Sequence, residues 1–375
     1  MKNRFLILLS FVLIVGRDVV CANTSMVRER ININRDWRYQ IDDPDGVGAA
    51  LHYSRLKPYL LPCANDFIIF GKRYQRPEGN PGENIAYVKS DFDDSEWRHL
   101  NLPHDWAIEG PFNIDYNGST GKLPYWGIRW YRKTLELSQD DAGKQIYLDI
   151  DGAMSYVSVW CNGQYVGGWP YGYASFRLDL TPYIKAGQKN VLAIRLDNPD
   201  DTSRWYPGSG IYRNVWLVKT SPVHVEQWGT FVRNQQVDSE IAVMEMGVNI
   251  ENHAGEDVQV KLQTSVYLQG KDGRPVGEEV TQSMTKDIAI KKDSWSSARF
   301  QFKVDKPKLW DIDTPNCYVA VSRVFMDGKE MDSYETPFGI RTIEFTHNQG
   351  FMLNGQKVAI KGVCMHPVSY THLTL

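Results

Sequence analysis

The chain has 375 residues, of which 42% are hydrophobic and 12% aromatic, so it has room for two or three domains with ordinary buried cores. Its formal net charge is −3 and no block of like charges occurs, which argues against a nucleic acid or an anionic membrane as partner. A neutral substrate fits this balance better. The 12 Trp and 20 Tyr suit a protein that handles carbohydrate, although aromatic-rich β-sandwich cores explain much of the excess as well.

Residues 1–22 have the pattern of a secretory signal peptide, in which basic residues precede the apolar run 5–15 and small residues end at Ala22. A run of this length is too short to span a membrane as a helix. We therefore expect cleavage after Ala22 and a periplasmic or secreted protein. A lipid anchor on Cys21 is the less favoured alternative, because Val20 is a poor residue before a lipidated cysteine.

The five cysteines show neither CxxC spacing nor a disulfide framework. Cys161 falls inside an alternating stretch and Cys317 follows a turn signal, so both are interpreted as packed thiols. No metal site and no cofactor are expected from this sequence.

Residues 27–220 are expected to form a two-sheet jelly roll, because many short alternating runs are joined there by turn residues. No convincing amphipathic helix interrupts these runs. Residues 47 to about 90 lack a sustained period, and the cluster 76–84 within them is interpreted as an ordered loop or flap. The expected strands cover 30–39, 130–135, 146–151, 155–161, 164–167, 176–180, 190–198 and 211–217.

Residues 222–340 carry a second β pattern of about seven strands, which indicates an immunoglobulin-like sandwich without the paired cysteines of antibody domains. The clearest runs are 223–226, 241–249, 258–268, 287–290, 298–302 and 318–321.

The stretch 203–217 combines a loop, a Pro-Gly-Ser-Gly turn and an alternating run. Arg204, Trp205 and Tyr206 precede the turn and are candidates for contact with a sugar, since pyranose rings present apolar faces to aromatic rings and their hydroxyls accept hydrogen bonds from a guanidinium. In the run 211–217, alternate residues are expected to face opposite sides, with its aromatics packing the core.

This stretch closely resembles the signature at the end of the N-terminal sugar-binding domain of glycoside hydrolase family 2, which includes β-galactosidases, β-glucuronidases and β-mannosidases. The motifs at 92–106 and 130–135 are similar to that family at the same relative places. Within the first motif, His104 and Asp105 either form a structural pair that pins the loop, or Asp105 lies near the sugar. Both interpretations are kept open.

Two further loops are weaker candidates. The loop 117–126 is free to project toward a neighbouring domain, as loops between sandwich strands often do. The carboxylates Asp197, Asp200 and Asp201 cluster ahead of the signature and are interpreted mainly as solvated turn residues.

Residues 342–366 resemble the start of the family's catalytic TIM barrel, the (β/α)8 fold, with its first strand expected at 358–363. In this resemblance, His366 stands where the family places a histidine that lines the sugar pocket. The tail 367–375 does not continue the match, whereas a whole barrel takes about 250 residues.

The resemblance implies a retaining β-glycosidase, in which one carboxylic acid protonates the leaving oxygen and a second carboxylate attacks the anomeric carbon. The family's two catalytic glutamates come from late barrel strands, so the catalytic residues are expected beyond the C-terminus and this polypeptide is expected to be inactive. A β-galactosidase of carbohydrate catabolism, acting on a glycoside or oligosaccharide, is the favoured activity, and homo-oligomer formation is left open. The alternative is a non-catalytic carbohydrate-binding protein.

Overall fold

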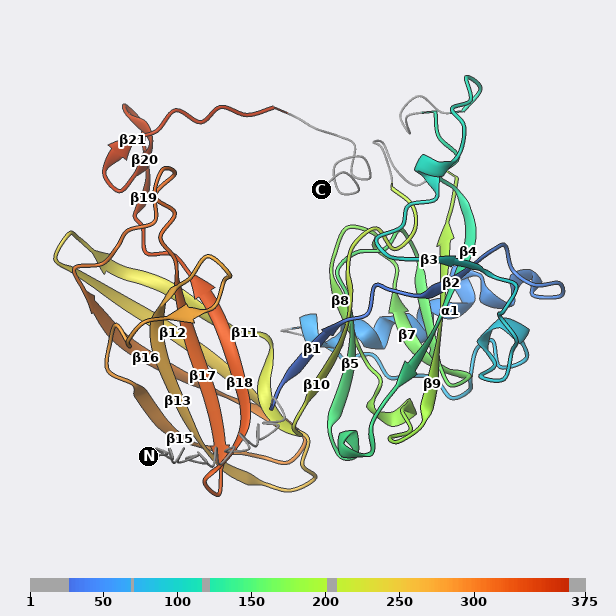
Figure 1. Ribbon diagram of the computed structural model, residues 1–375, viewed down its shortest axis with the longest axis horizontal. Coiled ribbons are helices and arrows are strands. Elements are labelled where there is room, and N and C mark those ends of the chain that lie inside the picture. The colour runs from blue at the N-terminus through green and yellow to red at the C-terminus, as the bar shows by residue number, and fades with distance from the viewer. Residues whose placement is uncertain (1–26, 69–70, 117–121, 201–207, 364–375) are drawn as a thin grey trace, which may run out of the picture.

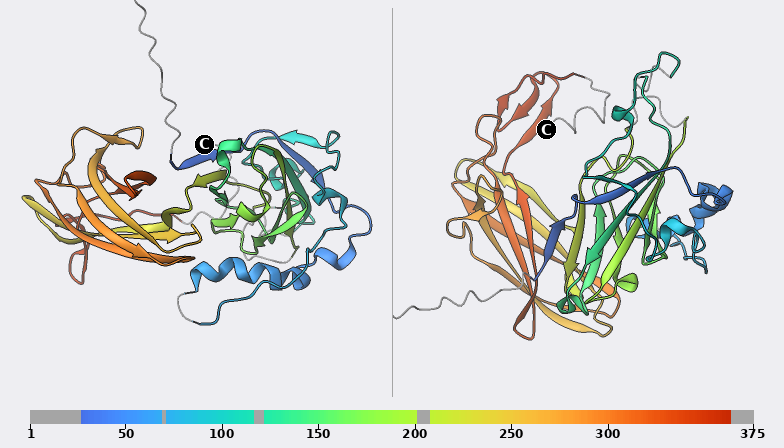
Figure 2. Two further views of the ribbon diagram at one scale, coloured as in Figure 1. Left: turned by 90° about the horizontal axis from the view of Figure 1, so that it is seen from below. Right: turned by 45° about the vertical axis from the view of Figure 1, so that its right-hand side comes forward.

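The structure is a computed structural model that describes residues 27–68, 71–116, 122–200 and 208–363, and the expected signal peptide lies outside them (Figure 1). Two β-sandwiches stand side by side, and a small three-stranded sheet extends from the second (Figures 1 and 2). The expected all-β class is therefore confirmed. Within the described ranges, no helix is long and apolar enough to cross a membrane.

The first sandwich is the expected jelly roll, built from two antiparallel sheets. The four-stranded sheet has the order β1 (Glu29–Asn32), β10 (Val215–Thr220), β5 (Gln145–Ile150) and β8 (Phe176–Asp179). The six-stranded sheet has the order β3 (Arg98–Leu100), β2 (Trp37–Ile41), β4 (Gly127–Glu136), β9 (Lys189–Asn198), β6 (Val157–Cys161) and β7 (Gln164–Trp169).

Both faces of the six-stranded sheet are buried. Because side chains alternate along a strand, Tyr131 of β4 packs between the two sheets, while the adjacent Trp130 belongs to a second apolar cluster on the opposite face. There Trp130 stacks on Trp160 of β6, with ring centroids 5.4 Å apart. Cys161 is a packed thiol, as expected, and burial raises its pKa to about 12.

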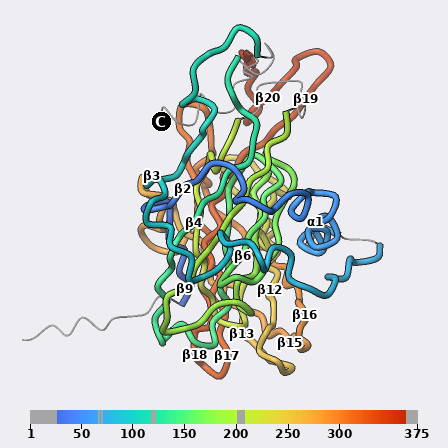
Figure 3. Tube along the Cα trace, turned by 90° about the vertical axis from the view of Figure 1, so that its right-hand side faces the viewer, coloured from blue at the N-terminus to red at the C-terminus, as the bar shows by residue number. Residues whose placement is uncertain are grey.

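The segment 47–90, which lacks a sustained period in the sequence, contains a helix, α1 (Tyr53–Leu60), which covers the outer side of the six-stranded sheet (Figures 2 and 3). Residues 76–84, expected as a loop, form neither helix nor strand. The sequence pattern does not reveal α1, because the helix has two turns and contains Pro58, so only Leu56 and Leu60 mark its buried face. Short 3-10 turns lie at η1 (Gly48–Leu51), η2 (Leu61–Phe67), η3 (Ala86–Val88), η4 (Ala107–Glu109), η6 (Gln139–Asp141) and η7 (Thr181–Tyr183).

Two buried arginines of the six-stranded sheet hold this cover in place. Arg195 of β9 donates two hydrogen bonds of 2.8 Å to the carboxylate of Asp43, and Arg132 of β4 donates one of 2.8 Å to Asp94. Both guanidinium groups are almost inaccessible to solvent, so removing either carboxylate would leave a buried charge without its shortest ion pair. The cover is therefore an integral part of the domain.

The second sandwich is the expected immunoglobulin-like domain. Its three-stranded sheet has the order β11 (Val223–Val237), β12 (Ile241–Asn252) and β16 (Ser294–Asp305). The facing sheet has the order β14 (Pro275–Val276), β13 (Val258–Gln269), β17 (Tyr318–Met326) and β18 (Lys329–Phe338), and β15 (Met284–Ile290) also pairs with β13.

Beyond this domain, β19 (Ile343–Thr346), β20 (Gly350–Leu353) and β21 (Gln356–Lys357) form a small antiparallel sheet. Residues 358–363, expected as the first barrel strand, are described but form no strand, and Ile360 and Val363 are 70% and 87% exposed. A parallel barrel strand is held by hydrogen bonds from neighbours on both edges, whereas in the described structure this segment pairs with no strand, although the nitrogen of Val358 donates a 3.0 Å hydrogen bond to the carbonyl of Phe351.

The two sandwiches are joined by a buried ion pair. Arg28, just before β1, donates hydrogen bonds of 2.9 and 2.7 Å to the carboxylate of Asp332 on β18. The same carboxylate accepts a bond of 2.7 Å from the backbone nitrogen of Val225, whose carbonyl accepts one from Arg28. Asp332 is fully buried, so this pair ties the first strand of the jelly roll to the second domain.

We predict that Asp332→Asn lowers the free energy of unfolding of the second sandwich by about 3–5 kcal/mol, because Arg28 then stays buried without a counter-ion. The matched control is Asp257→Asn, which removes an exposed pair with Lys291 in the same domain and should leave stability unchanged within error. Calorimetric unfolding of both variants measures the effect. Equal melting temperatures would contradict the prediction.

Candidate functional site

The two sequence motifs nearest the predicted sugar site pack against each other in the first sandwich. The backbone nitrogen of His104, in the motif 92–106, donates a 2.9 Å hydrogen bond to the carbonyl of Ile211, in the signature 203–217. The carbonyl of the neighbouring Gly210 accepts a 2.9 Å bond from the backbone nitrogen of Met154. The two motifs and the loop before β6 therefore form one hydrogen-bonded unit.

Glycine is required at position 210 by this contact. Its backbone has a φ of +80°, and a Cβ atom there would lie 2.3 Å from the carbonyl oxygen of His104 and 2.8 Å from the hydroxyl of Tyr131. The second glycine of the Pro-Gly-Ser-Gly turn thus serves both the left-handed conformation and the close approach of the two loops.

The run after the turn differs from its expected pattern. The strand β10 begins at Val215 rather than at residue 211, and the adjacent Ile211 and Tyr212 are both buried. The hydroxyl of Tyr212 donates a 2.7 Å hydrogen bond to the carbonyl of Gly172, so tertiary contacts and not sheet pairing determine its direction. Its packing role agrees with the interpretation from the sequence.

A buried amide fixes the described residues on both sides of 201–207. The side chain of Asn198 donates to the carbonyls of Tyr125 (2.8 Å) and Gly208 (3.2 Å), and the hydroxyl of Ser209 also donates to Tyr125 (2.6 Å). The hydroxyl of Tyr125 in turn donates to the carbonyl of Asp200. The predicted sugar-contacting residues Arg204, Trp205 and Tyr206 themselves lie outside the described residues, as does His366, so their roles stay predictions.

Asp105 is 1% exposed, and its Oδ1 accepts a 2.9 Å hydrogen bond from the backbone nitrogen of Ala107. His104 lies with Nδ1 2.7 Å from the hydroxyl of Tyr131 and Nε2 3.3 Å from Glu109. Burial lowers the pKa of His104, which favours its neutral form at pH 7. These contacts favour the pinning role for the His104–Asp105 pair, and contact between Asp105 and a sugar stays a prediction.

The loop between η4 and β4 projects from the same end of the molecule as β19–β21 (Figure 1). Phe112 and Ile114 on this loop are 70% and 81% exposed. Within 107–126, residues 117–121 lie outside the described part of the chain. Exposed apolar side chains on a projecting loop are suited to contact with another domain or a ligand.

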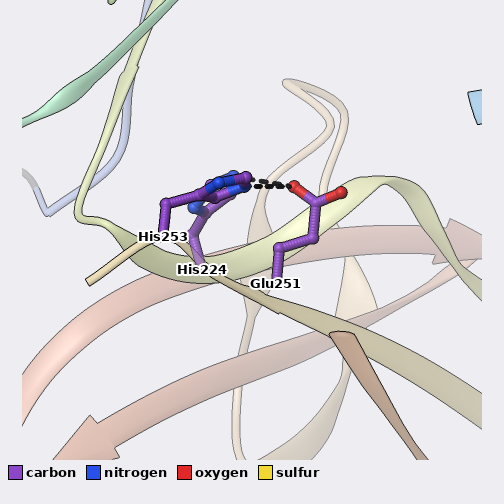
Figure 4. Close-up of side chains that lie close together, drawn as sticks. All are labelled: His224, Glu251 and His253. Carbon is purple, nitrogen blue, oxygen red and sulfur yellow. Dashed lines mark hydrogen bonds and ion pairs between the residues drawn. The ribbon is translucent and has the colours of Figure 1, made fainter. Parts of the chain in front are cut away.

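A second cluster, at the domain junction, had no signal in the sequence. His224 on β11 lies opposite Glu251 on β12, and His253 follows two residues later, so the three side chains gather on one face (Figure 4). Burial lowers the pKa of His224, whereas the contact with Glu251 raises the pKa of His253. Alternation indicates which face of a strand a residue lies on, but not which residue of the next strand lies opposite it. The cluster could therefore be recognised only once the strand register was known.

We predict that Gly210→Ala destabilises the first sandwich by about 1–3 kcal/mol more than Gly143→Ala, because only the former forces a Cβ atom into another backbone segment. Gly143 is a matched control, since its φ is also +80° and nothing lies within 4 Å of a Cβ built there. Urea unfolding of the two variants measures the difference. Equal losses of stability would refute the close-approach argument.

Two family models match this chain. The sugar-binding domain of glycosyl hydrolases family 2 matches residues 87–221, and the model described as glycosyl hydrolases family 2 matches residues 223–341. The boundary between the two matches falls at the short connection between β10 and β11, where the two sandwiches meet.

The relatives and solved structures agree with the family models. A β-galactosidase of Bacteroides ovatus is 40% identical over 351 residues, which are 92% of this chain and 36% of the relative. A β-glucuronidase of Formosa agariphila is 27% identical over 301 residues, which are 74% of this chain and 30% of the relative. The crystal structure of a glycosyl hydrolase family 2 member from Bacteroides cellulosilyticus has a TM-score of 0.73 at 28% identity, covering 90% of this chain and 38% of that one.

The chain thus spans about a third of the length of these relatives. Because the two family models together match more than half of its residues, the chain belongs to glycosyl hydrolases family 2, of which it contains the sugar-binding domain and the immunoglobulin-like domain.

Proposed function

We propose that the chain is the N-terminal part of a retaining β-glycosidase of carbohydrate catabolism that acts on β-galactosides. The observation that carries this proposal is the 40% identity to a β-galactosidase over 92% of the chain, against 34% identity over 80% of the chain to a putative β-glucuronidase of Formosa agariphila. The net charge of −3, without a basic cluster in the sequence, also suits a neutral sugar better than an anionic uronic acid.

In this proposal the first sandwich contributes to the rim of a sugar pocket. The hydrogen bonds around Asn198 and Gly210 provide a rigid base beside the signature loop, and binding residues are effective when a rigid scaffold positions them. The loop between η4 and β4 and the segment toward 358–363 lie at one end of the molecule (Figure 1), which supports a pocket completed by a barrel on that side. The immunoglobulin-like domain serves as a spacer.

The catalytic carboxylates belong, in this proposal, to the barrel. Retaining glycosidases need two carboxyl groups about 5–5.5 Å apart, one as acid and one as nucleophile. The described carboxylates of the first sandwich near the signature are engaged in the fold: Asp105 binds the nitrogen of Ala107, and Asp197 pairs with Arg195 at 3.3 Å. This supports the view that residues 1–375 alone supply no catalytic pair.

We predict that the purified 375-residue polypeptide hydrolyses no aryl β-galactoside, because it lacks an acid–nucleophile pair, whereas a version extended through a complete barrel hydrolyses it. An aryl β-glucuronide serves as the second substrate in the same assay. Turnover by the short form comparable with that of the extended form would contradict the placement of the chemistry. A preference of the extended form for the glucuronide would contradict the proposed specificity, and sugar binding without hydrolysis by either form would favour a carbohydrate-binding protein.

The same extended protein provides a test of the signature loop. Trp205→Ala should raise KM at least about tenfold through the loss of an apolar surface for the sugar ring, a change of about 1.4 kcal/mol in binding. Trp228→Ala, in the spacer domain and 56% exposed, is the matched control and should leave KM unchanged. Equal KM values for both variants would remove Trp205 from the proposed site.

Export to the periplasm or the medium is part of the proposal, and it rests on the sequence of residues 1–22. We expect the mature protein to begin at residue 23, which N-terminal sequencing of exported material measures. A chain that retains Met1, or one held in the membrane by a lipid on Cys21, would contradict cleavage after Ala22.

A further inference from the structure

We propose that His224, Glu251 and His253 bind a divalent transition-metal ion of the zinc class at the junction of the two sandwiches (Figure 4). The strand register brings the three together. His224 pairs directly with Glu251 in the antiparallel ladder, so their side chains lie on one face of the sheet. His253 is two residues after Glu251, so its side chain lies on the same face. The backbone nitrogen of His253 donates a 2.9 Å hydrogen bond to the carbonyl of Pro222, which fixes the third residue beside the first.

The positions of the three side chains suit the coordination of one ion, because both imidazoles converge on the same carboxylate oxygen. Nε2 of His224 and Nε2 of His253 each lie 3.4 Å from the same oxygen, Oε2 of Glu251. Charge-assisted hydrogen bonds between nitrogen and oxygen are usually about 2.7–2.9 Å long. Two ligands held about 2.0–2.1 Å from a tetrahedral zinc ion lie about 3.3–3.4 Å apart, which matches the distance of each histidine nitrogen from the carboxylate oxygen. All three ligand atoms lie within 4.8 Å of one another.

The donor set selects the class of metal. Two imidazole nitrogens and one carboxylate form a ligand set that zinc uses in proteins, whereas Ca²⁺ takes six to eight oxygen ligands. His224 is fully buried, but the side chains of Glu251 and His253 are 29% and 40% exposed, so the cluster is open to solvent on one side. An ion can enter there, and a water molecule can complete its coordination.

Two neighbouring atoms indicate how tightly the site binds the metal ion and what the ion does there. Nδ1 of His224 has no hydrogen-bond partner among the described residues, although metal-bound histidines usually donate their second N–H group, so we expect micromolar rather than tighter binding. The hydroxyl of Tyr147, on β5 of the first sandwich, lies 3.4 Å from Nε2 of His224. The ion would therefore sit where the two domains meet and would stiffen their junction.

The test is titration of the metal-stripped 375-residue chain with Zn²⁺ and, separately, with Ca²⁺ by isothermal titration calorimetry. We expect one Zn²⁺ per chain and no response to Ca²⁺. His253→Gln and Glu251→Gln should each weaken Zn²⁺ binding at least about tenfold, while the exposed His99→Gln on β3 should leave it unchanged. A Co²⁺-loaded sample should lack the absorption of thiolate ligands, which separates this site from the chain's cysteines.

The absence of Zn²⁺ binding by the unmodified chain would overturn the proposal, as would His253→Gln and Glu251→Gln variants that bind as tightly as His99→Gln. The partly exposed His253 and Glu251 carry the test, because substitution of the buried His224 can disturb folding, and circular dichroism verifies the fold of each variant. The titration measures metal binding and not hydrolysis, so its outcome is independent of the proposed glycosidase function.

Discussion

The buried ion pair between Arg28 and Asp332 determines how the two sandwiches meet. Removing two charges from water costs several kcal/mol for each, so such a pair persists only where hydrogen bonds satisfy both groups. Here Asp332 also accepts from the nitrogen of Val225, and Arg28 also donates to the carbonyl of that residue. Since β10 leads directly into β11, the domains are joined by one covalent connection and by this ion pair, and Tyr147 of the first sandwich lies beside His224 of the second.

The same need to satisfy buried polar groups organises the rest of the first sandwich. Arg132 and Arg195 point away from the core between the sheets. Each forms an ion pair with a carboxylate of the segment before β4, Asp94 and Asp43 respectively, and so holds that segment against the sheet. Around the signature, Asn198 plays the corresponding role without charge, because its amide joins three loop segments. The result is a rigid domain whose loops are available for binding.

The junction cluster differs from these structural contacts in its geometry. The pairs formed by Arg28, Arg132 and Arg195 include bonds of 2.7–2.8 Å, which is the length expected for charge-assisted hydrogen bonds. The contacts of His224 and His253 with Glu251 are 3.4 Å long, similar to the 3.3 Å contact of His104 with Glu109, but here two imidazoles converge on one carboxylate oxygen. The convergence of two imidazole nitrogens on one carboxylate oxygen, rather than the length of either contact, is the physical basis for assigning the cluster to an ion.

The sequence by itself determined the all-β class, the two sandwiches and the family, because alternation and short motifs are local properties of a chain. It did not reveal α1, whose two turns are too short for a helical period, nor that Ile211 and Tyr212 would both be buried, since their directions depend on His104 and Gly172. Residues 358–363 have the composition of a barrel strand, yet no strand forms there in the described structure, because pairing requires neighbours. Only the tertiary structure placed His224 opposite Glu251, since alternation assigns each residue to a face of the sheet but does not tell apart registers that differ by two residues.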